Sequence, residues 1–231
     1  MQSFSAQYVL GFRIKDNPNN GASLIVCSVY SEVMILQRTF YQRDILTVSR
    51  ELLGKILVHQ TQDGTTAGRI VETEAYAGPE DQAAHSSGGR RTPRNEIMFG
   101  EKGHAYVYLI YGMYYCVNMT AGSVAGKPEA VLIRALEPVE GQELMAKRRG
   151  YPKGKSATLT NGPGRLCMAL DITKGQYGAD LTTPPFYIKD AQTVPYPDIV
   201  ETSRIGIDYA GEWKDKPWRF YIKGNGFVSK A

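Results

Sequence analysis

The segment Ile70-Val71-Glu72-Thr73-Glu74-Ala75-Tyr76 is a strand-like run that places two carboxylates and a tyrosine among apolar residues. Strand side chains alternate between two faces, so Ile70, Glu72, Glu74 and Tyr76 are expected to share one face. A carboxylate beside an aromatic ring in a partly apolar pocket suits a general base next to a platform for a planar substrate. A half-exposed edge strand whose glutamates face water would show the same pattern.

About thirty residues later, positions 105–118 predict a β-hairpin whose two arms meet at Tyr111-Gly112. Alternate residues of the arms share a face: Tyr106, Tyr108 and Ile110 on the first arm, and Tyr114, Cys116 and Asn118 on the second. Tyr111 and Met113 lie at the tip, where exposed apolar groups are costly in water. Such a tip favours a wedge that separates stacked bases, or a tip packed under another loop.

The remaining pattern alternates short helices and strands. Asp44 predicts the N-cap of a helix that ends at Gly54, and a strand over 55–60 leads through the turn Asp63-Gly64 into the Glu74 strand. The later elements expected are a strand over 131–136, a helix from Pro138 to Gly150, a short helix that follows the turn at 161–164 and ends at Leu170, and a strand over 217–222. We therefore expect an α+β fold: a single mixed domain with a curved, largely antiparallel sheet, flanking short helices and a protruding hairpin.

Residues 1–33 differ from the rest of the chain, because the run from Asn17 to Gly21 interrupts short apolar stretches that have no sustained period. We expect this stretch to be a dispensable or disordered N-terminal extension, as a start codon assigned too early would produce. The functional domain is then residues 34–231, and this part carries all of the net charge of +4.

Composition restricts the class of protein without identifying it. The 231 residues are 42% hydrophobic, enough for a sizeable core, and the net charge of +4 permits a polyanionic partner. The three cysteines have no CxxC spacing and the three histidines form no HExxH motif, so we expect reduced thiols, no metal and no cofactor. No segment predicts a membrane span or a secretory signal, and we expect a cytoplasmic protein, nucleoid-associated in a bacterium.

Two further features indicate a polar site. Arg134 interrupts the apolar strand Val131-Leu-Ile-Arg-Ala-Leu136, so its guanidinium must pair with a carboxylate, extend to a cleft or snorkel from an edge strand. If it approaches Glu74, the pair could hold a water molecule. His85 by default faces solvent, and the loop over 86–95 combines glycines, three arginines and hydroxyl donors, which suits a phosphate backbone or a solvated basic loop.

In this order, the motifs resemble those of the alkyladenine DNA glycosylase family from about Phe40 through Val228. The matching motifs are Gly68-Arg-Ile-Val-Glu-Thr-Glu-Ala-Tyr76, Ala84-His85, Gly89-Arg90, Thr92-Pro-Arg-Asn95, Tyr108-Leu-Ile-Tyr-Gly-Met-Tyr114, Leu132-Ile-Arg-Ala-Leu-Glu-Pro138, Asn161-Gly-Pro-Gly-Arg-Leu166, Arg204-Ile-Gly206 and Trp218-Arg-Phe-Tyr221. Several are ordinary alone, but their sequence is highly specific. Residues 1–33 have no counterpart in the family.

The resemblance implies a role for each matching residue. Glu74 is implied as the general base that deprotonates water, Arg134 as the residue that holds this water, and Ile205 as a position whose backbone carbonyl orients it. Tyr76, His85 and Tyr108 are implied to sandwich the extruded base, Asn118 to reject guanine, Cys116 and Leu132 to line the pocket, and Tyr111 to intercalate. The positions implied near the DNA backbone and minor groove are Arg90, Arg94, Tyr106, Met113 and Tyr114. No catalytic role is implied for Glu72.

The implied enzyme is a monofunctional, base-excision-repair DNA glycosylase that acts as a monomer on double-stranded DNA. It flips alkylated or deaminated purines, such as 3-methyladenine, 7-methylguanine, hypoxanthine or ethenoadenine, and hydrolyses the N-glycosidic bond with a Glu-activated water. An abasic site remains, because no lysine in the matching pocket is available to form an imine.

Two alternatives come from other classes. A carbohydrate glycosidase would use Glu72 and Glu74, whose Cα atoms lie about 6.6 Å apart on one strand face. A non-catalytic lesion-binding DNA protein would need Tyr111 and the arginines but not Glu74. Activity on a chromogenic sugar would support the first, and binding of a lesion duplex without an alkali-labile site would support the second.

Overall fold

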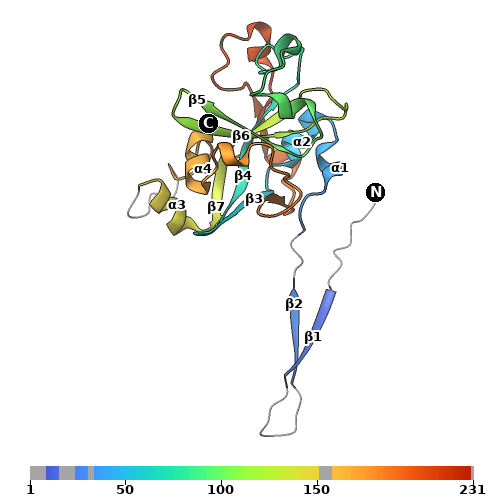
Figure 1. The fold of residues 1–231 in the computed structure, drawn as a ribbon, viewed down its shortest axis with the longest axis vertical. Helices are drawn as coiled ribbons and strands as arrows, with labels where there is room; N and C mark the ends of the chain where they lie inside the picture. Colours follow the sequence, from blue (N-terminus) through green and yellow to red (C-terminus); the bar gives the residue numbers. More distant parts are fainter. Residues whose placement is uncertain (1–8, 16–23, 31–33, 151–157, 230–231) are drawn as a thin grey trace. The chain divides into compact units, whose positions relative to one another are not determined.

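The computed structural model describes residues 9–15, 24–30, 34–150 and 158–229, in two compact units (Figure 1). The first unit comprises Met1–Met34, and the second comprises Ile35–Ala231. In the first unit, strands β1 (Val9–Lys15) and β2 (Leu24–Tyr30) pair in an antiparallel ladder. All the remaining elements belong to the second unit, which carries the candidate site.

An eight-stranded antiparallel sheet organises the second unit. Its strands are β3 (Ile56–Thr61), β4 (Gly64–Tyr76), β5 (Ala105–Ile110), β6 (Tyr114–Thr120), β7 (Ala130–Glu140), β8 (Phe186–Lys189), β9 (Ile199–Thr202) and β10 (Arg219–Ile222). The order is β5-β6-β7-β4-β10-β9, and β3 pairs with both β4 and β8. The long strand β4 is therefore hydrogen-bonded to three neighbours, and the predicted Glu74 segment lies inside the sheet rather than at its edge.

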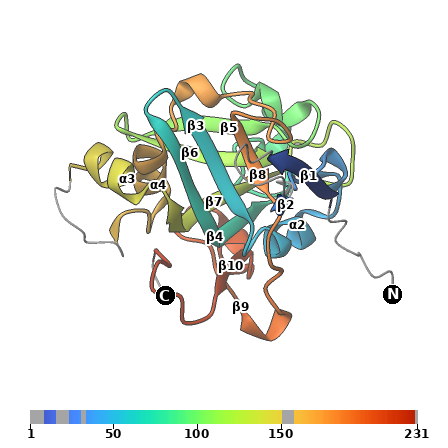
Figure 2. The same ribbon diagram turned by 90° about the horizontal axis from the view of Figure 1, so that it is seen from below.

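Short helices flank this sheet, which confirms the expected α+β fold (Figures 1 and 2). They are α1 (Arg38–Tyr41), α2 (Ile45–Glu51), α3 (Gln142–Arg148) and α4 (Pro163–Leu170), with 3₁₀ turns at Ser87–Gly89, Glu96–Phe99, Lys174–Gln176, Tyr196–Asp198 and Gly211–Asp215. The carboxylate of Asp44 caps α2 by accepting from the Thr47 amide at 2.9 Å, as predicted. None of the helices in the described ranges is long and apolar enough to span a membrane.

The helix expected from Pro138 begins later. Strand β7 continues through Pro138, which pairs with Gly68 beside an irregularity of the ladder, and α3 starts at Gln142. Proline lacks an amide donor but is tolerated where strand pairing is irregular. Gly141 separates the two elements with a φ of 71°, a left-handed conformation that ends the strand.

A β-bulge changes which side chains share a face of β4. The ladder with β7 shifts register between Ile70 and Glu72 and again between Glu72 and Thr73. Ile70 consequently packs with Ala75 in the main apolar core, and its expected position on the face of Glu72 is wrong. Glu72, Glu74 and Tyr76 retain the expected two-residue spacing, and the second irregularity lies opposite Arg134.

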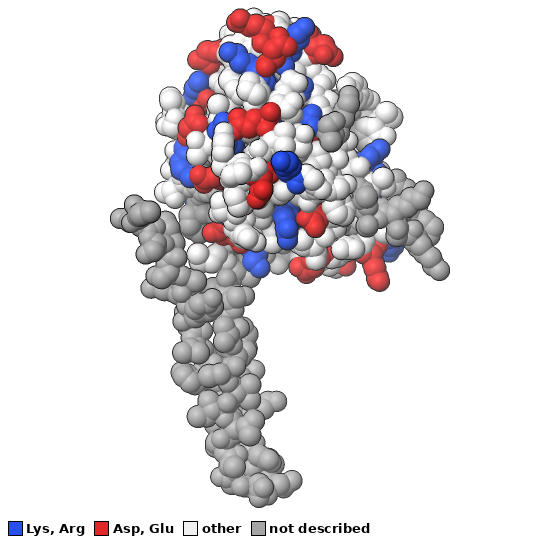
Figure 3. All heavy atoms as spheres, turned by 180° about the vertical axis from the view of Figure 1, so that it is seen from behind, with Lys and Arg blue, Asp and Glu red and all other residues white. Residues whose placement is uncertain are grey.

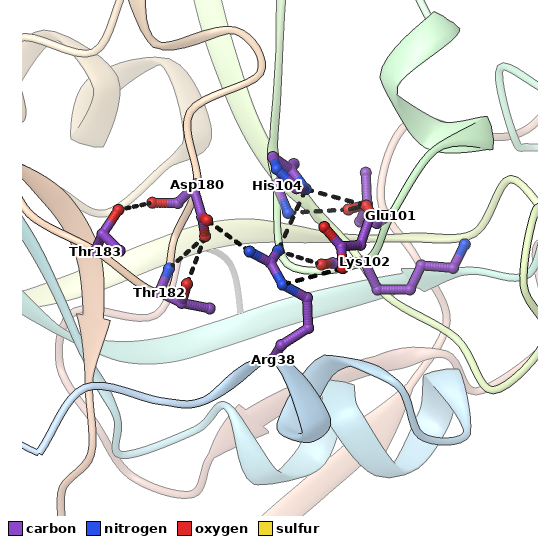
Figure 4. Close-up of polar contacts among 8 residues, drawn as sticks. Arg38, Glu101, Lys102, His104, Asp180, Thr182 and Thr183 are labelled. Atoms are coloured by element: carbon purple, nitrogen blue, oxygen red, sulfur yellow. Dashed lines mark hydrogen bonds and ion pairs between the residues drawn. The ribbon is translucent and has the colours of Figure 1, made fainter.

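Polar contacts attach α1 to two loops at the start of β5 and before β8 (Figure 4). The Arg38 guanidinium donates to the Lys102 carbonyl at 2.7 Å and to Asp180 Oδ2 at 2.5 Å. On the face that Figure 3 displays, acidic and basic side chains are interspersed. The Arg38 contacts join segments far apart in the sequence and stabilise the scaffold.

Candidate active site

Glu74 is fully buried and both of its carboxylate oxygens have partners. The Tyr76 hydroxyl donates to Oε2 at 2.8 Å, and the Ile205 amide donates to Oε1 at 2.8 Å. Nη1 of Arg134 lies 3.2 Å from the same Oε1 atom. These contacts fix the orientation of the carboxylate, as a positioned general base requires.

Arg134 approaches a carboxylate as the sequence predicts, and it approaches two. Its Nε donates to Glu72 Oε1 at 3.2 Å while Nη1 faces Glu74. Burial alone would lower the pKa of Arg134, but Glu74 and Glu72 outweigh that effect and raise the pKa above its ordinary value. The guanidinium therefore remains charged beside Glu74.

Glu72 has a different environment from Glu74. Its Oε1 lies 3.1 Å from Arg219 Nε and accepts from the Ser229 hydroxyl at 2.9 Å, and its Oε2 accepts from the Ser229 amide at 2.7 Å. A pair of catalytic carboxylates on β4 would need Glu72 free to reach a sugar. These contacts occupy Glu72 and speak against the carbohydrate glycosidase.

A buried ion pair, to which the sequence motifs assign no role, supports both donors to Glu74. Arg204 bonds Asp81 with two nitrogens, at 2.5 and 2.9 Å, and also donates to the carbonyl of Ala75 at 2.9 Å. Its guanidinium carbon lies 4.8 Å from the Tyr76 ring centroid. Arg204 thus contacts Tyr76 and directly precedes Ile205; its place in the motif Arg204-Ile-Gly206 was the only available signal.

An aromatic cavity of about 130 Å³ opens beside Glu74. Water occupies about 30 Å³ in the liquid, so this space holds a few water molecules or a small planar group. The cavity is lined by predicted site residues and by others: Tyr76, Ala83, His85, Met98, Tyr106, Tyr108, Ile110, Cys116, Asn118, Ala130, Leu132, Arg134, Pro163, Ile205, Gly206, Ile207 and Tyr209. All six residues predicted for a base pocket line it. The exposed Tyr209 also lines it, although no sequence motif indicates this position.

The β5–β6 ladder explains how one cavity wall forms. Tyr106 pairs with Asn118, and Tyr108 pairs with Cys116, so these side chains share a face as expected. Burial raises the pKa of Cys116 to about 11 and that of Tyr108 well above its ordinary value, so both groups remain neutral at pH 7. The Asn118 amide nitrogen donates to the Tyr106 carbonyl at 3.2 Å, which fixes the orientation of the amide.

His85 belongs to a second wall and is neutral. Its ring lies 4.6 Å from the Tyr108 ring, centroid to centroid, and its Nδ1 is 2.8 Å from the Tyr106 hydroxyl. Desolvation, followed by the charges of Arg94 and Arg90, lowers the pKa of His85 to about 4. In the tautomer whose Nδ1 accepts from the Tyr106 hydroxyl, Nε2 carries the imidazole proton.

Of the remaining predicted positions, Tyr106 lines the cavity and the other four do not. Arg94 stacks 4.7 Å over the Tyr108 ring, whereas Arg90 and Met113 are exposed. Tyr114 lines a neighbouring groove of about 600 Å³ that also contacts Arg134 and Ile205. Tyr106, expected near the DNA backbone, is instead only 2% exposed and contacts His85 inside the cavity, because it belongs to the inward face of β5.

Tyr111 projects from the tip of the β5–β6 hairpin and is 82% exposed. The Met113 amide donates to the Ile110 carbonyl at 3.2 Å across a turn whose central residues, Tyr111 and Gly112, have φ values of 54° and 69°. A tyrosine in the left-handed region costs about 1–2 kcal/mol relative to the ordinary regions. The tip is therefore exposed and is not packed under another loop.

Within the described ranges, no group of three or more His, Cys, Asp or Glu side chains could hold a metal ion. The Arg134 guanidinium, the His85 imidazole and the phenols of Tyr76 and Tyr108 line the cavity. The Glu74 carboxylate lies behind this lining, in contact with Tyr76 and Arg134. Together they offer a base, a fixed positive charge and flat aromatic surfaces.

Comparisons with known proteins identify the family. A sequence model of the family described as Methylpurine-DNA glycosylase (MPG) matches residues 39–226. A protein of Clostridium acetobutylicum is 52% identical over 202 residues, which cover 85% of this chain and 98% of the relative. Proteins of Methanocella arvoryzae and Bacillus cytotoxicus are 52% identical over 198 residues and 51% identical over 199 residues, covering 85% and 83% of this chain and 96% and 97% of the relatives.

All three relatives bear the name "Putative 3-methyladenine DNA glycosylase". The resemblance inferred from the motifs is thus confirmed at the level of the family. The chain belongs to the methylpurine-DNA glycosylase family, the DNA-repair hydrolases of N-glycosyl bonds.

Proposed function

We propose that this protein excises 3-methyladenine and related damaged purines from double-stranded DNA and leaves an abasic site. The observation that carries the proposal is the buried Glu74 carboxylate, held by Tyr76, Ile205 and Arg134 at an aromatic cavity. An enzyme that acts on a base inside a duplex must extrude the nucleotide into a pocket. The cavity and the exposed wedge Tyr111 provide the two parts that this step requires.

Glu74 acts in this proposal as the general base for the attacking water. The water binds beside Glu74 and Arg134, transfers a proton to the carboxylate, and attacks the sugar carbon as the base leaves with the electrons of the N-glycosidic bond. The amide of Ile205 is already bonded to Glu74, so its carbonyl is the backbone group that remains to orient the water, as the resemblance implies. Arg134 stabilises the Glu74 carboxylate before the reaction and holds the water in place during the reaction.

Aromatic stacking selects an electron-poor base. A purine alkylated at a ring nitrogen is cationic and leaves readily, and stacking of a cation on a tyrosine face contributes about 0.5–2 kcal/mol. Burial raises the pKa of Tyr76 well above its ordinary value, so this ring presents a neutral face to the base. Asn118, with its amide held by the Tyr106 carbonyl, is the group proposed to reject guanine by a clash with the exocyclic amine.

Neutral lesions such as hypoxanthine and ethenoadenine require a hydrogen-bond donor at the base. We assign this role to Nε2–H of the neutral His85, which its Nδ1 contact with Tyr106 leaves available. 7-Methylguanine belongs with the cationic substrates. Among the described residues that line the cavity there is no lysine to form an imine, which supports a monofunctional enzyme.

The surface around the cavity is proposed to hold the duplex. Tyr111 enters the base stack in place of the extruded nucleotide, and Arg90, Arg94, Met113 and Tyr114 lie near the backbone or minor groove. The exposed tip and the arginine loop support this assignment. We further propose that the protein acts as a monomer in the cytoplasm, where chromosomal DNA of a bacterium lies.

Single-turnover excision tests this function. Wild type and Glu74→Gln are compared on a duplex with one hypoxanthine or ethenoadenine and on methylated genomic DNA, scoring alkali-labile breaks; Glu143→Gln, which alters an exposed glutamate of α3, is the matched control. We expect Glu74→Gln to lose about 10²–10⁴-fold in rate, the contribution of a general base, while lesion binding persists. Equal cleavage by Glu74→Gln would remove Glu74 from the mechanism, and binding without cleavage of any substrate by wild type would favour the lesion-binding protein.

A further inference from the structure

The second glutamate of β4 has a specific environment that the proposed mechanism leaves unused. Glu72 is fully buried and receives contacts from three residues: Arg134, Arg219 and Ser229. A buried carboxylate is tolerated when it is paired and hydrogen-bonded. None of these partners belongs to its own strand, so three other segments of the fold contribute contacts to this one side chain.

The contact with Arg134 determines how that guanidinium is aimed. A guanidinium is planar and its five donors have fixed directions, so holding Nε restricts the direction of the Nη atoms. Arg134 Nε donates to Glu72 Oε1 at 3.2 Å, and Arg134 Nη1 lies 3.2 Å from Glu74 Oε1. Without Glu72, Arg134 would be free to turn both nitrogens of its fork toward Glu74.

Ser229 holds Glu72 from the segment that follows β10. Its amide donates to Oε2 at 2.7 Å and its hydroxyl donates to Oε1 at 2.9 Å, so both carboxylate oxygens are fixed. The preceding turn is ordered by Asn225, whose side chain accepts from the Phe227 amide at 2.9 Å and donates to Glu137 of β7 at 3.1 Å. Ser229 also lines the groove that contacts Arg134 and Ile205.

We propose that Glu72, held by Ser229, is a positioning residue that aims Arg134 at Glu74 and at the attacking water. The proposal rests on the proposed function, since it concerns the same reaction. It assigns the segment 225–229 to the working site, although Ser229 lies 157 residues from Glu72 in sequence. The chain Ser229, Glu72, Arg134, Glu74 acts on the chemical step and leaves recognition of the lesion to the cavity.

The test separates chemistry from binding. Wild type, Glu72→Gln, Ser229→Ala and Ser229→Thr are compared in single-turnover excision, lesion-duplex affinity and unfolding midpoint, with Thr183→Ala as a control for loss of an exposed hydroxyl. A small displacement of a catalytic group can cost about 100-fold. We expect Ser229→Ala to slow excision about 3–10-fold and Glu72→Gln about 10–100-fold at unchanged affinity, and Ser229→Thr to restore the wild-type rate.

A spectroscopic measurement tests the same contact without turnover. The Nε–H resonance of Arg134, assigned by its loss in Arg134→Lys, is expected to exchange slowly with solvent in wild type and measurably faster in Glu72→Gln and Ser229→Ala. Wild-type exchange in both variants, wild-type excision in both variants, or a rate loss that Ser229→Thr fails to restore would overturn the proposal. If wild type itself fails to excise any lesion, the proposed function fails, and the exchange result still decides whether Glu72 positions Arg134.

Discussion

Two glutamates at neighbouring positions on one strand face have different chemical surroundings. Glu74 contacts a phenol, a backbone amide and one guanidinium, all from residues that line the cavity, which suits a base that must exchange a proton. Glu72 contacts two guanidinium groups and a serine, of which only Arg134 lines the cavity, and this suits a fixed anchor. At the scale of the residue, the environment and not the residue type separates a base from an anchor.

The neutral state of His85 leads to a prediction on stability. Desolvation and two arginines lower the pKa of His85 from 6.5 to about 4 in the folded protein. Between these values the unfolded chain binds more protons, so the free energy of unfolding rises with pH and is lost as pH falls through the window. We expect His85→Gln to reduce the fall between pH 6.5 and 4.5 by about 1 kcal/mol, below the full linkage value because His85 is exposed to solvent and its charge is screened.

Urea unfolding of wild type and His85→Gln at pH 6.5 and pH 4.5 measures this difference. Carboxylates that titrate in the same range are present in both proteins, so their contribution cancels in the difference between wild type and the variant. Parallel pH dependences would show that His85 is not held neutral by its surroundings.

At the scale of the element, the β5–β6 hairpin combines exposure and strain at its tip. Tyr111 is exposed and left-handed, a combination that stability alone does not favour. Strained residues that persist in a well-ordered turn are concentrated at functional sites. The hairpin therefore gives up stability to present one aromatic side chain.

Replacement of Tyr111 should separate stability from activity. Asparagine tolerates a left-handed conformation, so Tyr111→Asn is expected to leave the free energy of unfolding unchanged or raise it by up to about 1 kcal/mol. Excision from duplex DNA should fall by about 10-fold or more, because extrusion of a base costs a few kcal/mol that a wedge offsets. Chemical denaturation and single-turnover excision measure the two effects.

Tyr196→Asn provides the comparison, since Tyr196 is another exposed tyrosine far along the chain from the hairpin. It should excise at the wild-type rate. A Tyr111→Asn variant with full activity on duplex DNA would show that the tip is not the wedge.

At the scale of the whole molecule, the site is built within the second unit. The main apolar core of the described residues begins at Leu36, and the family match begins at residue 39. Relatives that align over 96–98% of their own length correspond to only 83–85% of this chain. We propose that residues 1–33 are dispensable for folding and catalysis.

A shortened chain that begins at Met34 tests this proposal. We expect its free energy of unfolding to lie within about 0.5 kcal/mol of the full chain, the range of changes remote from the core. Its single-turnover excision rate should match that of the full chain. Loss of folding or of excision on removal of residues 1–33 would contradict the proposal. Circular dichroism detects a loss of folding, and the excision assay detects a loss of activity.

The sequence by itself determined the strand of Glu74, the Tyr111 hairpin, the cap at Asp44 and the faces of β5 and β6. These follow from local patterns, because alternation, turn residues and caps act over a few positions. It also indicated that Arg134 needs a carboxylate, since a guanidinium in an apolar strand has few stable solutions. The end of β7 was not predicted: Pro138 indicated the start of a helix, whereas in the structure it pairs with Gly68 as part of the strand.

Only the tertiary structure decided which distant groups meet at Glu74. Arg204 and Asp81 are 123 residues apart, and Ser229 and Glu72 are 157 apart, so no local period relates them. The bulge in β4 that moves Ile70 to the core depends on the register with β7. Such contacts are set by strand register and loop closure, whose free energies belong to the whole fold, and this is why the roles of Glu72 and Arg204 could not be predicted from their own segments.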